Sequence, residues 1–590
     1  MVGRVAFIVG VLVGFGCSPD VGLRLVFRVD SELSASLLSS TIRVESASPD
    51  APGTRPVLLE GLSADDLPIT VDVRPLDGDE SRKAYVSFEV EATGCAVRSE
   101  RVLSMTPGEF STVDYLLVQA CCDNSCGSGE ACFAGDGTVC APVCEGGTTF
   151  DPTARTCAEG PGGRLLPAAQ LRIEPLVGTL ETTFSFSIEL AEPVPGELSF
   201  EWDFDDDGEA DSTSPMPQTQ LAGDGVVSIG VRVRGADGRI AEAVGHVVIA
   251  QAADILVVTT DSDSVNASDG ELSLREAAVE AAASSTPQTI TFSGPMTIQL
   301  TERLDVEAVG ARLVGAPGVV LDGTSISGND CLALGASNMV VLGMEIRNCQ
   351  RHGILVRNPS SGTWVLHNQV RNGRAINAAG IWVGRGSEHR IGPGNLISGQ
   401  VAGIQLAGRD NRVFGNRAQN NGTGIIVEPT SPDDTAVVAG IRIAANELVG
   451  NQVGARIHAE VQSVEVFHNT VVDSVEDGVV IESSALTRIV ANNLVAFNAG
   501  AGIRADSRIS VGRGLFFDNG AGPCTGGCVV GAQAIDEAPG FYDRANEDFR
   551  LGPESPAIDA GEPLDLDRNG ARAGRFNGSG PDLGANESPR

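Results

Sequence analysis

Residues 446–481 read NELVGNQVGARIHAEVQSVEVFHNTVVDSVEDGVVI, and the pattern in this stretch recurs along the second half of the chain. In it, Gly454 and Gly478 each precede an apolar residue, any residue and a second apolar residue. The glycine recurs at steps of 21 to 30 residues, at Gly353, Gly380, Gly403, Gly424, Gly454, Gly478 and Gly502. An asparagine recurs in phase with it, at Asn368, Asn395, Asn416, Asn446, Asn469 and Asn493. A fixed period of this length indicates stacked units that cannot bury their apolar faces alone.

Within each repeat the apolar residues alternate with a period of two, which predicts strands rather than helices. In the stretch VEVFHNTVV we expect Val466 and Val471 to point inward, with Asn469 at the bend between them. Strands this short, without helical crossovers, predict a parallel β-helix whose asparagines form an internal ladder. We expect the glycines to supply tight corners with positive φ. The alternative is a β-sandwich, which does not require the two in-phase series.

The segment LSLREA, Leu272 to Ala277, resembles the CSLREA motif that precedes right-handed parallel β-helices in bacterial surface proteins. Residues 273–283 predict a helix that is capped by Ser273 with Glu276 three residues later and closes the open end of the coil. The stretch from Ser555 to Glu587 resembles the usual end of that family. Within it, Asp565, Asp567 and Asn569 make a possible calcium turn. The resemblance implies a fold, but this fold hosts lyases, hydrolases, epimerases and structural proteins.

The sequence therefore predicts an all-β protein: a right-handed single-stranded parallel β-helix with a cap at each end, preceded by two small β-sandwiches and a disulfide-rich module. Alternating runs separated by turns predict the first sandwich, and a Gly- and Pro-rich linker ends the cysteine-rich stretch. The expected domains are a signal peptide (1–17), a sandwich (20–118), the cysteine-rich module with its linker (119–163), a second sandwich (167–250) and the β-helix (254–590).

The amino terminus predicts export, because Arg4 precedes an apolar run from Val5 to Phe15. The run is too short for a stable membrane span. The stretch resembles a bacterial lipoprotein signal with Cys17 as the lipidated residue; the alternative is a plain cleaved signal peptide. The 590-residue chain has a net charge of −36. Nucleic acid is therefore not an expected partner, since binding to phosphates requires a basic surface.

Cysteines in an exported chain predict disulfides. Two local pairs are expected, Cys331–Cys349 and Cys524–Cys528. Further bridges are expected among Cys95, Cys121, Cys122, Cys126, Cys132, Cys140, Cys144 and Cys157. The rival interpretation is a zinc site, which the absence of nearby histidines and of paired CxxC units disfavours.

The second sandwich contains the turn WDFDDDG, Trp202 to Gly208, which resembles the WDFGDG-type turn of the PKD domain, an Ig-like module of surface proteins. Four aspartates alternate with other residues around the glycine, and this spacing suits Ca²⁺. They are Asp203, Asp205, Asp207 and Asp211. Ser214 stands where an EF-hand loop has its bidentate acid, so the affinity is expected to be modest. The alternative is a solvated acidic turn.

One outward column of the predicted strands carries Glu428, His458 and Glu482 in three consecutive coils. The two glutamates are expected about 9–10 Å apart, two strand spacings, which approaches the carboxylate separation of inverting glycosidases. One would act as acid and the other as base. A lyase would instead use Arg456 as base beside Glu428. The alternative to both is an exposed charged face.

Residues 351–417 hold nine arginines and only two acids. Such a patch suits an anionic glycan, and a tryptophan within it suits stacking on a sugar ring. The expected ligand-binding residues are Trp382, Arg385, Arg409, Arg412 and Arg456. The alternative is that the arginines protect coil edges from pairing.

We therefore expect a monomeric protein of the bacterial cell envelope, either an outer-membrane lipoprotein held by its lipid anchor alone or a secreted protein. Adhesion or glycan binding through the β-helix is favoured over catalysis. The alternative is a polysaccharide-degrading enzyme, an inverting glycoside hydrolase or a lyase. Calcium is the only cofactor expected, in a structural role.

Overall fold

The computed structural model describes two compact units, residues 1–160 with 563–566 and the rest of the chain. In the first unit it describes the backbone of twelve strands. In the second it describes residues 166–588 apart from 167, 191–193, 195–196, 236–238, 267, 374–377, 431–436, 483–486, 553–554 and 565–579. Among the described residues, no helix has the length and apolar character that crossing a membrane requires.

The first unit contains two four-stranded sheets and two hairpins, in the stretch for which the first β-sandwich and the cysteine-rich module are predicted. One sheet orders β1 (Ile8–Gly10), β5 (Ile69–Val73), β2 (Gly22–Val29) and β8 (Phe110–Leu117). The other orders β4 (Val57–Leu62), β3 (Leu37–Ser46), β6 (Lys83–Ala92) and β7 (Cys95–Ser104). The hairpins are β9 (Glu130–Phe133) with β10 (Val139–Pro142), and β11 (Thr148–Asp151) with β12 (Thr156–Glu159).

Most of the predicted lipid and disulfide chemistry of this unit lies outside the described residues. This holds for Cys17, Cys121, Cys122, Cys126 and Cys144. For Cys95, Cys132, Cys140 and Cys157 only the backbone is described. The lipid anchor and these bridges therefore stay predictions.

The second β-sandwich packs a three-stranded sheet against a four-stranded one around Trp202, Phe184 and Phe186, all at most 1% exposed. The smaller sheet orders β13 (Ala169–Glu174), β15 (Phe184–Leu190) and β17 (Gln218–Thr219). The larger orders β14 (Val177–Gly178), β19 (Ile240–Ile249), β18 (Gly225–Gly235) and β16 (Leu198–Asp203).

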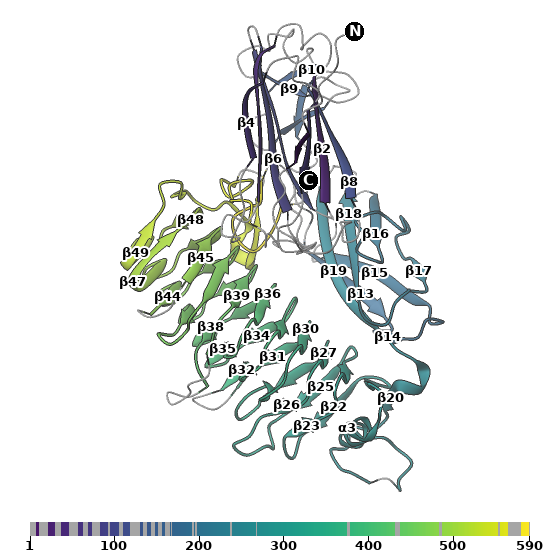
Figure 1. Cartoon of the computed structure of the whole chain (residues 1–590). Helices are drawn as coiled ribbons and strands as arrows, with labels where there is room; N and C mark the ends of the chain where they lie inside the picture. Colours follow the sequence, from purple (N-terminus) through teal and green to yellow (C-terminus); the bar gives the residue numbers. More distant parts are fainter. Residues whose placement is uncertain are drawn as a thin grey trace. The chain divides into compact units, whose positions relative to one another are not determined.

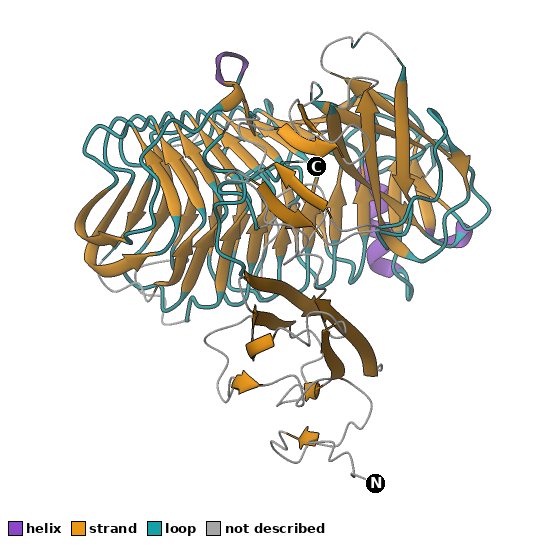
Figure 2. Ribbon diagram, turned by 90° about the horizontal axis from the view of Figure 1, so that it is seen from above, coloured by secondary structure: helices purple, strands orange, loops and turns teal. Residues whose placement is uncertain are grey.

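The remainder of the second unit winds as a parallel β-helix with three ten-stranded sheets, seen as stacked rows of strands in Figures 1 and 2. Sheet 1 runs β20 (Ile255–Val258), β21 (Thr289–Phe292), β24 (Arg312–Val314), β27 (Val340–Leu342), β30 (Trp364–Leu366), β33 (Arg390–Ile391), β36 (Arg412–Phe414), β39 (Ile441–Ala444), β42 (Val464–Phe467) and β45 (Thr487–Ala491). Sheet 2 runs β22 (Met296–Gln299), β25 (Val319–Asp322), β28 (Glu345–Arg347), β31 (Gln369–Arg371), β34 (Leu396–Ser398), β37 (Arg417–Gln419), β40 (Glu447–Val449), β43 (Thr470–Val472), β46 (Asn493–Ala496) and β48 (Gly514–Phe517). Sheet 3 runs β23 (Leu304–Val306), β26 (Leu332–Leu334), β29 (Ile354–Val356), β32 (Ala379–Val383), β35 (Ala402–Leu406), β38 (Thr423–Val427), β41 (Val453–Ile457), β44 (Val479–Ile481), β47 (Ile503–Val511) and β49 (Cys524–Val530).

The predicted asparagine ladder is confirmed at the corner between sheets 1 and 2. Each side-chain amide donates to the Oδ1 of the asparagine in the next coil, at 2.8 to 3.0 Å, from Asn368 through to Asn493. Val466 and Val471 point inward on either side of Asn469, as expected. The ladder satisfies backbone groups at the bend that no strand partner reaches.

The glycines do not play the role expected of them. None of the seven repeating glycines has a positive φ; that conformation belongs to the residue before each ladder asparagine, such as His367 or Ala445. A Cβ on Gly403 or Gly424 would instead lie 2.5 Å from the carbonyl oxygen of the glycine in the next coil. The glycines are therefore required because successive backbones approach closely at the start of each sheet 3 strand.

The predicted cap helix is confirmed as α3 (Leu274–Ala283). Ser273 and Glu276 form a capping box, in which each side chain accepts a backbone N–H of the other residue. Leu274, Ala277 and Ala281 are buried in the same core as the first coils, so the helix closes that end of the β-helix.

The C-terminal segment covers a side of the β-helix and not only its end. Its hairpin β50 (Phe541–Asp543) and β51 (Asp548–Leu551) flanks the short 3₁₀ helix η3 (Arg544–Asn546). Phe549, Leu551 and Leu583 pack on Val472 and Leu515, on the outward face of the last strands of sheet 2. The outward face of sheet 2 is therefore covered, and not exposed to solvent, at its last strands.

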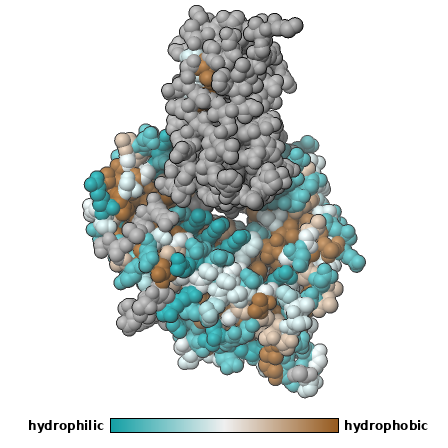
Figure 3. All heavy atoms as spheres, viewed as in Figure 1, coloured by the Kyte–Doolittle hydropathy of each residue, from teal (hydrophilic) through white to brown (hydrophobic). Residues whose placement is uncertain are grey.

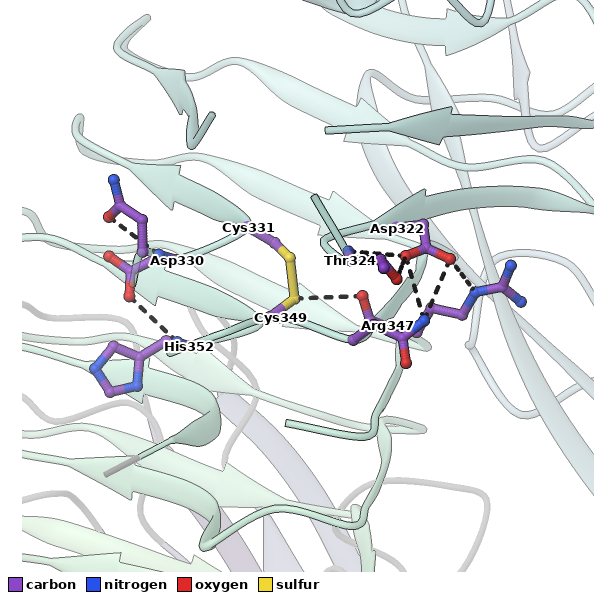
Figure 4. Close-up of a disulfide and its surroundings, with 9 residues drawn as sticks. Asp322, Thr324, Asp330, Cys331, Arg347, Cys349 and His352 are labelled. Atoms are coloured by element: carbon purple, nitrogen blue, oxygen red, sulfur yellow. Dashed lines mark hydrogen bonds and ion pairs between the residues drawn. A yellow bond between two sulfur atoms is a disulfide. The ribbon is translucent and has the colours of Figure 1, made fainter. Parts of the chain in front are cut away.

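Both predicted local disulfides are confirmed. Cys331 and Cys349 join two successive coils next to sheet 3, as Figure 4 shows, and Cys524 and Cys528 close a loop in the last strand of sheet 3. Each bridge restricts the unfolded chain and thereby stabilises the fold.

The second sandwich packs on the outward face of the first coils of sheet 1. Val248 shares an apolar cluster with Val314, Leu342 and Leu366. Beside it, His246 Nδ1 lies 2.7 Å from His367 Nε2. Burial, together with the repulsion of His367, lowers the pKa of His246 to about 3, and burial lowers the pKa of His367 to about 4. Both rings are therefore neutral at physiological pH.

Candidate functional site

The outward face of sheet 3 carries a row of aligned side chains. Trp382 of β32 pairs in register with Gln405 of β35, then Ile426 of β38 and Arg456 of β41. All four are half-exposed, whereas Val480, next in the row, is 1% exposed. The row therefore offers an open strip four strands long, with neighbours about 4.8 Å apart.

A second row lies beside it, just beyond the carboxyl ends of the strands. Glu428, His458 and Glu482 follow β38, β41 and β44, and the backbone N–H of each donates to the coil before it. The three side chains occupy consecutive coils, as the period of the sequence predicts. In this position they border the strip that contains Trp382 and Arg456.

The two glutamates differ in their surroundings. Glu428 is half-buried and accepts a hydrogen bond from Gln405 Nε2 at 2.7 Å. Burial raises the pKa of the Glu428 carboxyl. Glu482 accepts the backbone N–H of Ala459 at 3.0 Å and lies 3.9 Å from Arg456 Nη1. Glu428 is thus biased toward its protonated form, whereas Glu482 is engaged by a backbone donor and an arginine.

His458 links the second glutamate to a third acid. Its Nε2 lies 3.7 Å from Glu482, and its Nδ1 contacts Glu460. The contact with His458 lowers the pKa of the Glu460 carboxyl. Arg456, the residue predicted as a lyase base beside Glu428, makes its ion pair with Glu482.

Trp382 is fixed from beneath by a buried histidine. The ring of His352, which is 3% exposed, stacks on the indole with centroids 5.6 Å apart and planes inclined by 22°. The His352 backbone N–H donates to Asp330 at 3.2 Å, and the disulfide lies alongside (Figure 4). Burial lowers the pKa of His352 to about 4, so a neutral ring supports the tryptophan.

The five residues predicted to bind a ligand do not all share one face. Trp382 and Arg456 stand in the sheet 3 row, and Arg385 follows β32. Arg412 lies on sheet 1, and Arg409 lies at the corner between sheets 3 and 1. Of the nine arginines of residues 351–417, those that the structure describes are also divided among the three sheets, because residues that are close in the sequence lie on different sides of one coil. Arg351, Arg357, Arg371 and Arg417 form ion pairs with acids.

The acidic turn of the second sandwich brings three of its four aspartates together. Carboxylate oxygens of Asp203, Asp205 and Asp211 lie within 4.8 Å of one another. Asp207 uses its Oδ1 to accept the backbone N–H of Glu209 at 2.7 Å. The arrangement suits a hard cation, and calcium here stays a prediction. Asp565, Asp567 and Asn569, the other predicted calcium turn, lie outside the described residues.

Two polar series were not predicted from the sequence. A second asparagine ladder follows the first by five residues and links Asn421 to Asn451 and Asn498 to Asn519. A row on sheet 1 precedes the first ladder by four or five residues and contains Trp364, Arg390, Arg412 and Arg442. Counting offsets from Asn368, Asn395, Asn416 and Asn446 would have found both series.

Two hollows lined by described residues lie away from the sheet 3 strip. One, of about 210 Å³, lies on sheet 1 between Asp410, Arg412, Arg442 and Glu465. The other, of about 330 Å³, lies beside the first coil between Thr259 and Met296. Neither of these two hollows includes Glu428, His458 or Glu482.

Comparison with known proteins agrees with the fold. The family model described as "Right handed beta helix region" matches residues 305–421 and 367–512. No curated protein matches this sequence. Among solved structures, the pectate lyase Pel9A is 15% identical over 57% of this chain and 96% of its own, with a TM-score of 0.33.

A periplasmic alginate epimerase is 14% identical over 48% of this chain and 72% of its own, with a TM-score of 0.30. The family 28 exopolygalacturonase of Yersinia enterocolitica is 10% identical over 63% of this chain and 98% of its own, with a TM-score of 0.29. These similarities are too low to transfer an activity. The chain thus contains a right-handed parallel β-helix region between residues 305 and 512.

Proposed function

We propose that this protein binds a polysaccharide chain along the outward face of sheet 3, as an adhesion or glycan-binding protein of the cell surface. The observation that carries the proposal is the open strip from Trp382 to Arg456, bordered by Glu428, His458 and Glu482. Its side chains recur once per strand, and a polysaccharide is the kind of ligand that repeats at a similar spacing.

The chemistry of the strip suits sugars. The indole of Trp382 is held flat against His352 and remains half-exposed, which supports stacking on a sugar ring. Gln405, Arg456 and the two glutamates supply donors and acceptors for hydroxyl groups. An open strip lets a chain enter from the side without threading, as adhesion to long polymers requires.

Retention of the full-length protein on immobilised neutral and acidic polysaccharides tests the proposal. Trp382→Ala is expected to weaken retention about tenfold on the bound polymer, the order of one aromatic stacking contact. Tyr542→Ala is the matched control, because it removes a partly exposed aromatic ring from another part of the unit. Equal retention of wild type and both variants on every polymer would contradict the proposal.

A second candidate function is hydrolysis of the bound chain. It is favoured by the raised pKa of Glu428 and the position of Glu482 two coils away. Such a pair fits an inverting hydrolase with Glu428 as acid and Glu482 as base. The Glu482 contacts to Ala459 and Arg456 favour a structural role for that carboxylate, so binding is the preferred function.

Release of reducing ends from the retained polymer separates the two functions. Binding alone predicts no release above the level of Glu428→Gln. Hydrolysis predicts release that falls at least a hundredfold in Glu428→Gln while retention persists, because loss of a general acid removes about two orders of magnitude or more.

Attachment to the envelope is proposed on the sequence alone. Cys17 would carry the lipid, and the monomeric β-helix would meet its glycan outside the cell. Metabolic labelling with an alkyne fatty acid is expected to mark the wild type and not Cys17→Ser. Labelling of both proteins, or of neither, would contradict the anchor.

A further inference from the structure

The outward face of sheet 1 changes character along the β-helix. Its first coils carry Val314, Leu342 and Leu366, which the second sandwich covers. The neighbouring row, which contains Val340 and Trp364, continues as Arg390, Arg412 and Arg442 in three consecutive strands. These arginines therefore begin where the sandwich contact ends.

Like charges opposite one another on neighbouring strands destabilise a sheet unless something neutralises them. Sheet 2 shows the usual solution. Arg347 and Arg371 are also aligned, and each is neutralised by an acid of its own face, Asp322 at 2.9 Å and Glu345 respectively. In this pair of stacked arginines, each guanidinium therefore has an acid of its own.

The sheet 1 row lacks this compensation at one end. Arg442 pairs with Glu465 at 2.9 Å. Arg390 is exposed, and among the described residues no carboxylate pairs with it; its guanidinium lies 5.6 Å from the centre of the Trp364 ring. An exposed guanidinium beside an indole is positioned to bind an anion carried on an apolar ring.

The hollow of about 210 Å³ lies at the next two arginines. Arg412 and Arg442 form part of its wall, with Ser463 and the backbone of Gly440. Asp410 and Glu465 also line it, so the hollow favours a group that brings both an anion and hydroxyls. A sugar acid has both, whereas a simple anion has only charge.

We propose that Arg390, Arg412 and Arg442 form a second binding surface, which takes an acidic polysaccharide along sheet 1. The strand spacing of about 4.8 Å brings successive guanidinium groups near the charges of successive sugar units. The surface lies on a different sheet from Trp382 and Glu428, so it does not depend on the function proposed for sheet 3. The chain as a whole has a net charge of −36, so most of its surface is expected to repel an anionic ligand.

Affinity electrophoresis of the full-length protein tests the proposal, with polygalacturonate, dextran sulfate and neutral dextran as probes. We expect the two charged polymers to retard the wild type and dextran not to do so. Arg390→Gln/Arg412→Gln is expected to weaken the retardation at least tenfold, and added salt to weaken it in the wild type. A preference between the two charged polymers identifies carboxylate or sulfate as the group recognised.

The matched control is Arg347→Gln/Arg371→Gln, which removes the same charge from two aligned arginines of sheet 2. It is expected to leave the retardation unchanged. Equal weakening by the control would show attraction to bulk charge and overturn the proposal. Equal retardation by a single-stranded oligonucleotide of the same charge would overturn the recognition of sugar.

A measurement on the wild type covers the case in which the double variant fails to fold. Phenylglyoxal modifies accessible arginines, and mass spectrometry locates the products. Polygalacturonate is expected to slow modification of Arg390 and Arg412 severalfold, with Arg172 on the second sandwich as the exposed reference. Equal rates with and without the polymer at Arg390 and Arg412 would overturn the proposal.

Discussion

The interior of the β-helix and its outward faces follow different rules. Inside, the coils from Asn368 to Asn493 repeat the same solution, with an aliphatic stack, an asparagine ladder and a glycine column. Outside, successive coils of one sheet present tryptophan, glutamine, isoleucine and arginine at the same position. Figure 3 shows the consequence, a mostly hydrophilic surface with separate hydrophobic areas. The interior defines the fold, whereas the outward faces are free to carry function.

The largest expected effect comes from breaking the interior. Asn446 is fully buried and donates to Val413, Ala444 and Asn469. Asn446→Leu leaves several buried polar groups without partners, each costing about 1–3 kcal/mol. We therefore expect the free energy of unfolding to fall by roughly 4 kcal/mol. Urea denaturation measures it.

The control for this substitution is Gln452→Leu, which places the same side chain at an exposed position six residues away. We expect its free energy of unfolding to change by about 0.5 kcal/mol or less. Similar losses for the two variants would mean that the ladder does not stabilise the interior.

Removing the bridge between coils has the next largest effect. The Cys331–Cys349 disulfide joins two residues with a sequence separation of 18. Cys331→Ser/Cys349→Ser is expected to lower the free energy of unfolding by about 3 kcal/mol, mainly by freeing the unfolded chain. Calorimetry under oxidising conditions measures the change. A melting temperature equal to that of the wild type would contradict the bridge.

The contact between the second sandwich and sheet 1 is expected to depend on pH. The pKa values of His246 and His367 are lowered in the fold to about 3 and about 4, from an ordinary value of 6.5. Their neutral forms therefore stabilise the contact fully above pH 6.5, and this stability is lost as the pH falls toward 4. We expect the loss to be about 3 kcal/mol for the two rings together by about pH 5.5, at about 1.4 kcal/mol per ring and pH unit.

His246→Leu/His367→Leu isolates this effect from the many carboxylates. The advantage of the wild type over the variant in the free energy of unfolding is expected to shrink between pH 7.5 and 4.5. Denaturation at a series of pH values measures it. A constant difference across that range would mean that the two rings do not titrate with folding.

The interior could be predicted because its residues recur with the period of the coil. The spacing alone predicts an internal ladder for Asn469 and a repeating corner for Gly454, although the reason for the glycine is close approach of backbones and not positive φ. For the outward site, the sequence indicates candidate residues but not which of them lie together on one sheet. Arg412 and Trp382 are 30 residues apart and lie on different sheets, because the side of the coil depends on corner lengths that vary between repeats.

Contacts between the β-helix and segments outside its repeats could not be predicted from the repeat pattern. His246 lies before the β-helix, whereas His367 lies several coils into it, and nothing in the sequence around His246 indicates His367 as its partner. The C-terminal cover of sheet 2 through Phe549 and Leu583 is of the same kind. Such pairings depend on three-dimensional complementarity, which a single sequence does not reveal.

The smallest expected effect on stability belongs to the outward face. Trp382→Ala is expected to change the free energy of unfolding by about 1 kcal/mol or less, because the ring is half-exposed, while glycan retention falls about tenfold.

Calcium at Asp203, Asp205 and Asp211 is expected to raise the melting temperature by a few degrees, an effect that Asp205→Asn removes. A melting temperature indifferent to calcium would contradict that site.

Amide hydrogen exchange of the full-length protein, with and without the retained polysaccharide, tests most directly whether the outward face of sheet 3 is the binding surface. The account predicts slower exchange in and just beyond β32, β35, β38 and β41, with β40 and β43 of sheet 2 unchanged. Protection confined to the two sandwiches, or spread equally over all three sheets, would contradict it.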